Sequence, residues 1–465
     1  MKIYSILILI FLMLMSCSGS DSTPTGGGTP IGGGSGNPPT TTQYSEAELL
    51  VLAEKDPLKY FWDYAESNSK LARERYNTDN PSLDANIVTT GGSGFGLMTI
   101  LVGIKNGYVS RSEAVSRLTT SLQFLENADR FHGAWPHWID GSTGKVIPFG
   151  NLDNGGDLVE TAFLVQGLIC VREFFKDSTD PTEKALVTKA DALWKGVEWD
   201  WYRQGNQNAL YWHWSPSNQW AINLKIQGYN ECLMTYVLAA ASPTHSIPKV
   251  VFDQGYESGG SIKNGAVQYG IPVVANHAGA SGNVGPMFFS HYSFLGLDPN
   301  GLSDANLNYQ DVTTNHAKIM YQYCLANPKG YVGYSAKSWG LTASYSRNAD
   351  GSTGYSAHSP LNDLGIISPT AALSSFPYTP TESMAMLKFL YNDNYDKYIG
   401  VAGPYDAYSL QYNWVTPRYL AIDQGPIAPM VENYKTGFIW SLFMNAPEVK
   451  QGLIKLGFHS TKYNF

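Results

Sequence analysis

Residues 110–125 read SRSEAVSRLTTSLQFL, and this stretch decides the fold class. Ser110 and Glu113 form a capping-box pattern, which marks the start of a helix. Apolar residues then follow at spacings of three and four, so that they share one helical face: Val115, Leu118, Leu122 and Leu125. Similar start signals recur at 45–48 and at 180–183. We therefore predict a protein built from amphipathic helices.

Further helical periods extend outward from this segment over 94–106, 157–175, 219–241, 304–326, 369–392 and 426–444. Long loops rich in glycine and aromatic residues separate them, and no second linker interrupts the pattern. Helical hairpins of this kind can close into a ring. We expect residues 44–465 to form one all-α domain, an (α/α)6 toroid whose loops make a cleft at one end. The glycine-rich run at 91–96 lacks the ending of a phosphate loop, and we interpret it as a tight turn that enters a helix.

The first 43 residues predict export and anchoring. Lys2, an apolar run over 3–15 and Cys17 have the pattern of a lipoprotein signal peptide at 1–17. Residues 18–43 are mostly Gly, Ser, Thr and Pro, which is typical of a flexible tether. We expect lipidation of Cys17 and an exported lipoprotein that faces the periplasm or lies on the outer-membrane surface. An ordinary secretory signal with an incidental cysteine is the alternative.

Composition excludes several classes of partner. The chain has 465 residues, a net charge of −8, 43% hydrophobic residues and 15% charged residues. Binding to a phosphate backbone needs clustered Lys and Arg, so we expect no nucleic-acid partner. The other three cysteines are widely spaced and no HExxH motif is present, so we expect neither a metal nor another cofactor. We expect a monomer whose membrane contact is limited to the lipid anchor.

Aromatic loops predict a cleft that binds sugar. Trp138, Trp212 with His213, and Trp339 lie beside glycine, histidine or other aromatic residues in predicted loops. The face of an indole packs against the C–H face of a sugar ring while its N–H bonds a hydroxyl. Burial in the core is the alternative for each of these residues, because most aromatic side chains are buried.

Two carboxyls three residues apart, Asp157 and Glu160, follow a double glycine at a predicted loop-to-helix junction. Glycosidic cleavage needs one carboxyl as acid and another as base or nucleophile. This pair shares one helix face, and the glycines allow backbone to come close to a ligand. Taken alone, however, the spacing favours a helix cap.

Glu231 and Asp423 are the other candidate acids. Glu231 and Lys225 are the only charged residues between 219 and 241, so apolar surroundings should raise the pKa of Glu231, as a general acid requires. The alternative is a solvent-facing or ion-paired Glu231. Asp423 precedes a predicted helix, where it serves either chemistry or capping. Arg418 is expected to hold a carboxylate or to bind substrate hydroxyls.

Several motifs occur in a distinctive order: Thr89-Thr90-Gly91-Gly92-Ser93-Gly94-Phe95-Gly96-Leu97, Gly155-Gly156-Asp157-Leu158-Val159-Glu160-Thr161-Ala162, Gly228-Tyr229-Asn230-Glu231, Ser290-His291-Tyr292 and Ala421-Ile422-Asp423-Gln424-Gly425-Pro426. In this order the chain resembles the glycoamylase-like proteins of Bacteroidetes and glycoside hydrolase family 144, the bacterial endo-β-1,2-glucanases. The resemblance extends from about residue 47 to the C-terminus. It implies an (α/α)6 fold and hydrolysis of β-glucan with inversion. It also implies that the pocket acids are Asp157, Glu160, Glu231 and Asp423, with Asp153 as a further member.

We predict a glycoside hydrolase that cleaves a glucan with inversion, above all a β-1,2-linked glucan. Glu231 is the predicted proton donor, and Asp157 or Asp423 would position or activate water, directly or through a substrate hydroxyl. The predicted substrate contacts are Asp153, Trp138, Trp212, His213, Tyr229, His291, Trp339 and Arg418. Three alternatives remain: an exo-acting or glucoamylase-like enzyme on another linkage, a polysaccharide lyase that uses Tyr229 or His213, and a non-catalytic glycan-binding lipoprotein.

Overall fold

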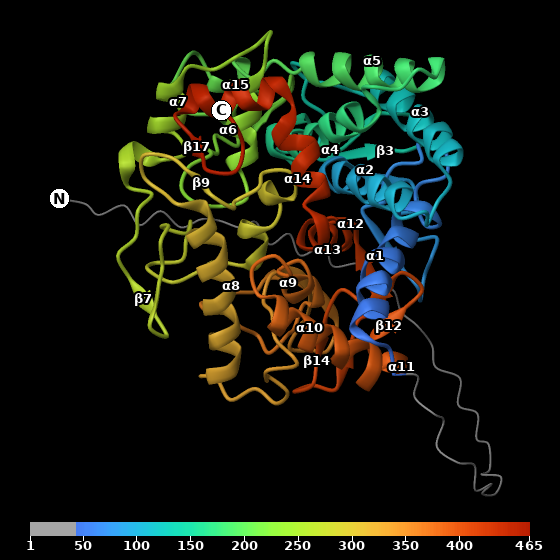
Figure 1. The fold of residues 1–465 in the computed structure, drawn as a ribbon, viewed down its shortest axis with the longest axis vertical. Coiled ribbons are helices and arrows are strands. Elements are labelled where there is room, and N and C mark those ends of the chain that lie inside the picture. The colour runs from blue at the N-terminus through green and yellow to red at the C-terminus, as the bar shows by residue number, and fades with distance from the viewer. Residues whose placement is uncertain (1–42) are drawn as a thin grey trace, which may run out of the picture. The chain divides into compact units, whose positions relative to one another are not determined.

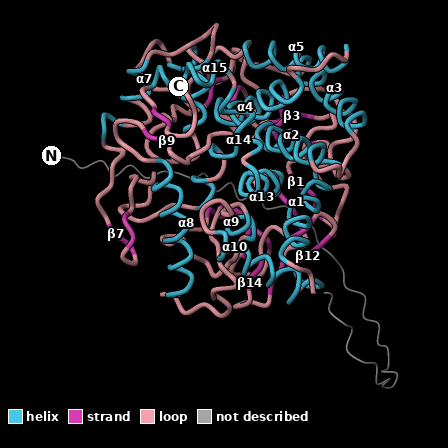
Figure 2. The backbone as a smooth tube through the Cα atoms, in the orientation of Figure 1, coloured by secondary structure: helices cyan, strands magenta, loops and turns pink. Residues whose placement is uncertain are grey.

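Helices form most of the regular structure, and short strands connect the long loops between them (Figures 1 and 2). The computed structural model describes residues 43–465. Its helices are α1 (Glu46–Trp62), α2 (Thr90–Lys105), α3 (Arg111–Asn127), α4 (Leu158–Phe175), α5 (Pro181–Lys195), α6 (Leu233–Ala241), α7 (Lys249–Gln254), α8 (Tyr309–Ala326), α9 (Pro369–Leu373), α10 (Pro380–Lys388), α11 (Tyr395–Tyr398), α12 (Ala421–Gln424), α13 (Ile427–Thr436), α14 (Phe438–Asn445) and α15 (Pro447–Leu456). Its strands are β1 (Arg75–Asn77), β2 (Ile87–Thr89), β3 (Trp138–Asp140), β4 (Val146–Ile147), β5 (Gly156–Asp157), β6 (His213–Trp214), β7 (Val267–Gln268), β8 (Ile271–Pro272), β9 (Leu302–Ser303), β10 (Ala343–Arg347), β11 (Thr353–Ala357), β12 (Ile399–Gly400), β13 (Gly403–Pro404), β14 (Tyr408–Ser409), β15 (Trp414–Val415), β16 (Arg418–Leu420) and β17 (His459–Ser460).

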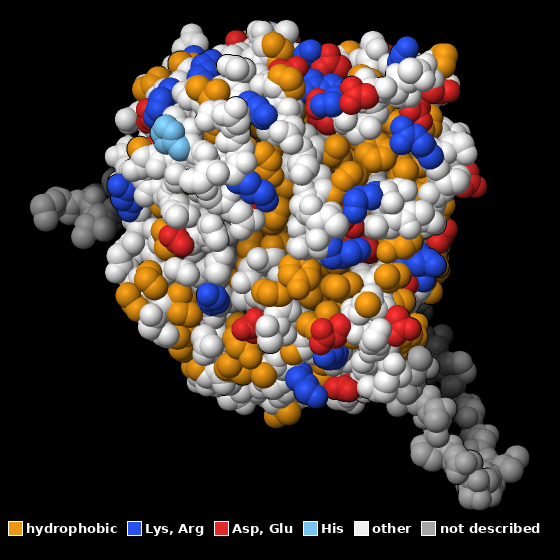
Figure 3. Space-filling view, in the orientation of Figure 1, with side chains coloured by type: hydrophobic (Ala, Val, Ile, Leu, Met, Phe, Trp, Pro, Cys, Tyr) orange, Lys and Arg blue, Asp and Glu red, His pale blue; other side chains and the backbone are white. Residues whose placement is uncertain are grey.

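Residues Tyr44–Phe465 make up one compact unit. The predicted signal peptide, the lipidation site Cys17 and the tether up to residue 42 lie outside the described residues. Among the helices of residues 43–465, none is both long enough and apolar enough to cross a bilayer. The face shown in Figure 3 mixes basic and acidic side chains, with apolar side chains between them.

The helix starts predicted from capping residues are confirmed. The side chain of Ser45 accepts the N–H of Glu48 before α1, and Ser110 does the same for Glu113 before α3. Asp180 caps α5, which begins with a proline as predicted. These caps satisfy backbone N–H groups that have no partner within the first turn.

The glycine-rich run at 91–96 belongs to α2, which corrects the predicted turn. A Cβ on Gly94 would lie 2.1 Å from the carbonyl oxygen of Phe163 in α4, and one on Gly167 would lie 2.3 Å from the carbonyl oxygen of Gly94. The two helices therefore touch backbone to backbone, which only residues without a side chain permit. Both helices are buried along nearly their whole length.

The helix predicted over 219–241 is wrong for its first part, because only α6 is helical there. Gln219, Asn223 and Gly228 have φ values of 49°, 48° and 80°. Left-handed backbone cannot continue a right-handed helix. Glu231 therefore lies in the loop before α6 and not on a helix.

Two other predicted helices are each divided in two, at a proline or a glycine that the spacing of apolar residues did not reveal as a break. The segment 369–392 divides into α9 and α10, and Pro380 stands at the first position of α10, where its missing N–H costs nothing. The segment 426–444 divides into α13 and α14 at Gly437, whose φ is 68°. The segment 304–326 is helical only from Tyr309, behind an Asn308 cap.

Short antiparallel strand pairs hold the loops of the candidate site together. In β5–β6, Asp157 lies opposite His213. In β1–β16, Arg75 lies opposite Leu420, which brings the segment after Glu74 beside the start of α12. The hairpin β10–β11 pairs Tyr345 with Tyr355.

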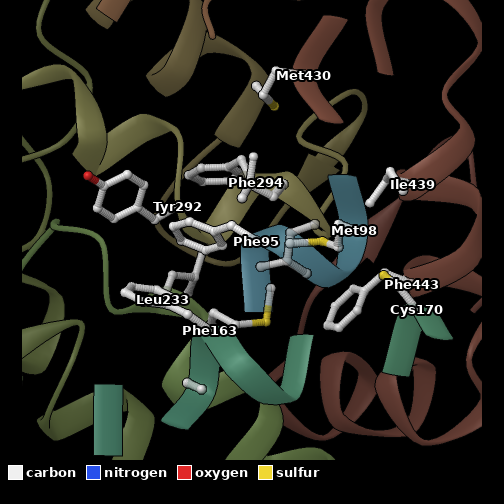
Figure 4. Close-up of a cluster of buried hydrophobic side chains, with 14 of the residues drawn as sticks. Phe95, Met98, Phe163, Cys170, Leu233, Tyr292, Phe294, Met430, Ile439 and Phe443 are labelled. Carbon is white, nitrogen blue, oxygen red and sulfur yellow. The ribbon is translucent and has the colours of Figure 1, made fainter. Parts of the chain in front are cut away.

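Aromatic rings of the core support this region from below. Tyr292 packs against Phe95 and Phe163, with ring centroids 5.2 and 5.6 Å apart. Figure 4 shows the Tyr292 hydroxyl turned away from these apolar side chains. The ring of Tyr292 thus packs in the core, while its hydroxyl points out of the core.

Candidate active site

The side chain of Asp157 caps α4 and holds two ring systems. Its Oδ1 accepts the N–H groups of Val159 and Glu160, each at 2.9 Å. Its Oδ2 accepts from His137 Nδ1 and Trp212 Nε1, each at 3.0 Å. Asp157 is fully buried, and the four donors fill the lone pairs of both oxygens. Asp157 is therefore the helix cap that its spacing from Glu160 favoured. Because no lone pair is left to activate water, the prediction that Asp157 activates water is revised.

His137 is a half-buried cation beside the acids. Burial lowers the pKa of His137, but Glu160 and Asp157 outweigh this effect and raise it to about 10. The imidazole stacks on Phe149, with centroids 4.0 Å apart, and Phe149 meets Trp138 edge to face at 4.9 Å. Phe149 is 49% exposed, so this aromatic wall reaches solvent next to the carboxyls.

Asp153 and Glu160 titrate close to neutral pH. Burial raises the pKa of each to about 7; the charge of Asp157 adds to the rise and the His137 cation opposes it. Glu160 Oε2 accepts the N–H of Gly91 at 2.7 Å. A Cβ on Gly91 would lie 2.5 Å from that oxygen, so the glycine leaves the space that the carboxyl fills.

His137, Asp153 and Asp157 also form a geometrically plausible metal-binding set. One ligand atom from each lies within 4.8 Å of the others. However, both oxygens of Asp157 already accept N–H groups, and His137 carries protons on both nitrogens when it is charged. This donor set fits a hydrogen-bonded proton network better than a metal centre.

Glu231 is a partly exposed carboxyl whose raised pKa suits a general acid. Burial, with a smaller contribution from Asp157, raises the pKa of Glu231 to about 7, although the side chain is only half-buried. Within residues 43–465, no Lys, Arg or His comes within salt-bridge distance of it, so it is not ion-paired there. Ser293 Oγ donates to the Glu231 carbonyl and fixes the local backbone. The group suits a general acid.

Asp423 faces a second buried carboxyl, Asp406. Asp423 and Asp406 are 1% and 2% exposed, and their carboxyls lie within hydrogen-bonding reach of each other. Burial raises the pKa of Asp406 to about 6, and burial with the neighbouring Asp406 raises the pKa of Asp423 well above its usual range. Asp423 lies inside α12 and accepts no backbone N–H, so it does not cap a helix.

Two tyrosines connect the acids. Burial raises the pKa of Tyr292 well above its usual range, and the charges of Asp423, Glu231 and Glu160 act on the same phenol. Tyr355, on β11, is 50% exposed, yet burial with Asp423 and Asp406 also raises its pKa. Carboxyls from α4 (Glu160), from the loop before α6 (Glu231) and from α12 (Asp423) therefore lie around one tyrosine, Tyr292.

Three predicted substrate contacts lie beside Asp157, Asp153 or the aromatic wall. Trp212 bonds Asp157, and Trp138 belongs to the aromatic wall; both are partly exposed. His213 is buried, and its Nε2 accepts the N–H of Gly155 at 3.0 Å and lies 3.4 Å from Asp153 Oδ1. Arg418 instead pairs with Asp79 at 3.3 Å.

Three other predicted contacts lie in the core; for Trp339 this is the alternative given above, and for Tyr229 and His291 it corrects the prediction. Trp339, Tyr229 and His291 are 0%, 0% and 1% exposed. Trp339 donates to the carbonyl of Glu382, and Tyr229 bonds the hydroxyl of Ser290. They support the walls and offer no surface to a sugar.

Asp406 and Tyr355 are site residues that the sequence prediction missed. No periodic or capping pattern surrounds Asp406. For Tyr355 a signal existed, because Asp350-Gly351 between two short polar-aromatic runs is a typical hairpin turn. The hairpin would have placed Tyr355 opposite Tyr345, but its position over the acids depends on tertiary packing.

Comparisons with known proteins identify the family of the chain. A family model described as "Putative glucoamylase" matches residues 223–447. The endo-β-1,2-glucanase of Chitinophaga pinensis, solved with sophorotriose and glucose, is 52% identical; the match covers 90% of this chain and 100% of that chain, with a TM-score of 0.87. The exo β-1,2-glucooligosaccharide sophorohydrolase (non-reducing end) of Parabacteroides distasonis is 42% identical over 438 residues and 90% of this chain. The present chain spans 59% of the length of that sophorohydrolase.

A mostly helical domain with carboxyls gathered under an aromatic wall is the arrangement of a glycoside hydrolase. The chain belongs to the glycoamylase-like family, glycoside hydrolase family 144, that includes the Chitinophaga endo-β-1,2-glucanase. The membership inferred from motif order is confirmed. An endo-β-1,2-glucanase of Talaromyces funiculosus shares the fold at 11% identity, with a TM-score of 0.59 over 86% of this chain and 87% of that one.

Proposed function

We propose that the protein is an inverting glycoside hydrolase that cleaves β-1,2-linked glucan. The observation that carries the proposal is that Glu231, with a pKa of about 7, and Asp423, paired with Asp406 whose pKa is about 6, both act on the phenol of Tyr292. Glycosidic hydrolysis needs a proton donor and a proton acceptor that both work near neutral pH. The β-1,2 linkage is supported by the names of the 52% and 42% identical relatives.

The proposed architecture is the (α/α)6 toroid. It is supported by helices that pack pairwise: α2 with α4, α4 with α5, and α6 with α15. Glu231 lies in the loop before α6 and Tyr355 on β11, so the site residues come from distant parts of the chain.

In the proposed mechanism Glu231 protonates the glycosidic oxygen as its bond to the anomeric carbon breaks. Water attacks that carbon from the opposite face, and its proton passes to Asp423, directly or through a substrate hydroxyl. Asp157, with its lone pairs filled, holds Trp212 and the His137 cation in place. Trp138 and Phe149 supply apolar faces for sugar rings.

Incubation with linear glucans of β-1,2, β-1,3, β-1,4 and α-1,4 linkage tests the proposal. We expect cleavage of the β-1,2-glucan, with α-anomeric reducing ends in early NMR spectra. Mixed oligosaccharides indicate endo action, whereas a single disaccharide product indicates the exo action named for the Parabacteroides relative. An ultraviolet-absorbing unsaturated end would mean a lyase, and binding without any product would mean a glycan-binding protein.

Glu231→Gln tests the proton donor. We expect kcat to fall by about 100-fold to 10,000-fold while the thermal unfolding transition is retained, because the amide cannot donate a proton of the required acidity. Glu257→Gln is the matched control: Glu257 is another buried glutamate whose pKa burial raises to about 7, but it bonds Asn306 and takes no part in the site. A Glu231→Gln variant with nearly full activity would exclude this residue as the acid.

We also propose that the protein is a monomer, exported and held to a membrane through acylated Cys17. The signal-like residues 1–17 and the tether-like composition of 18–43 support this proposal. Labelling with a fatty-acid analogue should mark the wild type and not Cys17→Ala. Light scattering of the chain from residue 44 should give the mass of one copy, and a dimer mass would contradict the monomer.

A further inference from the structure

The second carboxyl beside Asp423 has no assigned role, and its surroundings restrict what it can do. Asp406 lies between β13 and β14, and its Oδ2 accepts the N–H of Tyr345 from β10 at 2.7 Å. Its Oδ1 is buried and accepts no N–H or O–H. The backbone thus fixes one oxygen of Asp406 and leaves the other for Asp423.

Asp423 has no other polar partner. Both of its oxygens are buried without an N–H or O–H donor, and the carboxyl within hydrogen-bonding reach of them is that of Asp406. A hydrogen bond between two carboxyls requires a proton on one of them. The nearby Arg75 and Arg418 are paired with Asp84 and Asp79, and across residues 43–465 no basic side chain neutralises the pair.

We propose that Asp406 and Asp423 hold one proton between them, and that Asp406 is the positioning residue that receives this proton when Asp423 takes one from the attacking water. The proposal rests on the proposed function. In the step, a water O–H bond breaks and its proton bonds to one oxygen of Asp423. The proton on the other oxygen of Asp423 moves to Oδ1 of Asp406, and the pair changes from a charge of −1 to 0. The hydroxyl formed from water bonds to the anomeric carbon.

This arrangement resolves a conflict in the site. A carboxyl that holds a proton cannot accept another at the same oxygen, so Asp423 alone would be a poor base. With Asp406 as the acceptor behind it, Asp423 passes one proton on as it gains another. Two close carboxyls that cannot both ionise behave as one titrating unit. The pKa of Asp406 is about 6, and burial with the neighbouring Asp406 raises the pKa of Asp423 well above its usual range.

Other ionisable groups lie beside the pair or beside the tyrosines that neighbour it, and they contribute to any pH profile. They are Glu74 ahead of β1, Arg75 on β1, Glu160 on α4, Tyr292, Tyr345 on β10, Tyr355 on β11 and Arg418 on β16. Glu74 adds to the rise in the pKa of Asp423. The tyrosine pKa values lie above their usual range, so the tyrosines stay neutral where the enzyme would be assayed.

Infrared spectroscopy in D2O at pH 8.5 tests the shared proton without any assay of activity. Asp153, Glu160 and Glu231, with pKa values of about 7, are mostly ionised there, whereas the proposal requires the pair to keep its proton. We expect a carbonyl band of a protonated carboxyl in the wild type, and its loss in Asp423→Asn and in Asp406→Asn. A wild-type spectrum without the band would overturn the proposal even if β-1,2-glucan is cleaved, and a band without cleavage would contradict the proposed function alone.

The pH profile of kcat/KM tests the transfer to Asp406. In Asp406→Asn an amide N–H faces Asp423 in place of a carboxylate, so the acidic limb should move down by at least one pH unit and kcat should fall at least tenfold. Asp363→Asn is the matched control, since Asp363 is equally buried but bonds Tyr323 and Tyr334 away from the site; it should keep the wild-type limb.

An unchanged limb in a folded Asp406→Asn would show a merely structural role and overturn the transfer. If this variant does not fold, Asp406→Glu replaces it. The longer acid keeps an acceptor, so it should retain the infrared band and more than a tenth of the wild-type kcat. Loss of the band in a folded Asp406→Glu would likewise overturn the proposal.

Discussion

At the scale of single residues, the number of hydrogen-bond donors separates the acids of this site. Asp157 receives four N–H groups, Glu160 receives one, and Asp423 receives none. A carboxylate surrounded by donors serves as an anchor, whereas a carboxyl without them holds or exchanges a proton. The chemical role of each acid thus follows from the backbone around it more than from the residue type.

Gly91→Ala should reduce activity strongly without unfolding the protein. The new Cβ would lie 2.5 Å from Glu160 Oε2, so the carboxyl must move and lose its hydrogen bond to residue 91. We expect kcat/KM to fall at least tenfold in steady-state assays, since small displacements of site groups have effects of about this size.

Gly265→Ala is the control for that variant. No heavy atom lies within 4 Å of the position that its Cβ would take, and its backbone needs no positive φ. We expect wild-type kinetics from it. Equal losses in the two variants would mean that alanine at 91 acts through general stability and not through Glu160.

The sequence predicted part of the site and could not predict the rest. Glu231 was identifiable because few charged residues surround it in the chain, and that isolation corresponds to real desolvation. Asp406 has no such signature, since its partner Asp423 and its donor Tyr345 come from distant segments. Trp339 shows the reverse error, because an aromatic residue beside glycine is the same pattern whether it faces a sugar or the core.

At the scale of elements, capping residues predicted the helix starts correctly, whereas the spacing of apolar residues did not predict where the helices end. The starts of α1, α3 and α5 follow from local hydrogen bonds between residues three apart, which the sequence displays directly. The loop before α6 and the break between α13 and α14 depend on φ values that the hydrophobic pattern does not encode. The positions of the strands were not predicted either, because most strands span two or three residues and are too short to show an alternating pattern.

Gly437→Ala should destabilise the protein by about 1 kcal/mol, the usual cost of a left-handed backbone for a residue with a Cβ. The position has φ 68° and no heavy atom within 4 Å of a Cβ, so backbone conformation is the sole cost. Urea unfolding measures the effect, and kcat should not change.

Gly437→Asn separates this cause from others, because asparagine tolerates the left-handed region better than alanine. It should lose less stability than alanine despite its larger side chain. An asparagine variant that is less stable than the alanine variant would point to a steric cause.

At the scale of the whole molecule, the buried acids make stability depend on pH. For Asp153, Glu160 and Glu231 the folded pKa is about 7, above the ordinary value of an unfolded carboxyl. The folded state therefore binds more protons, and the stability gained in this way is present below about pH 4 and is lost as the pH rises through 7. A domain with this site should lose unfolding free energy between pH 4.5 and 8.

Glu231→Gln isolates one part of this effect. Glutamine has no proton to lose. The unfolding free energy of the variant, relative to that of the wild type, should therefore rise by about 1 to 3 kcal/mol between pH 4.5 and 8. Urea midpoints at the two pH values measure the change. An equal difference at both values would show that Glu231 ionises in the folded protein as it does in the unfolded chain.

The direct contact between α2 and α4 divides the molecule into a part that is constrained and a part that is free to vary. Gly91 and Glu160 sit on two helices whose backbones touch, so the position of this acid is set by the framework itself. The aromatic wall and the hairpin that carries Tyr355 are loops attached to that framework. Mutations that lengthen or exchange those loops can redesign which glucan is accommodated, while the reactive groups keep their coordinates.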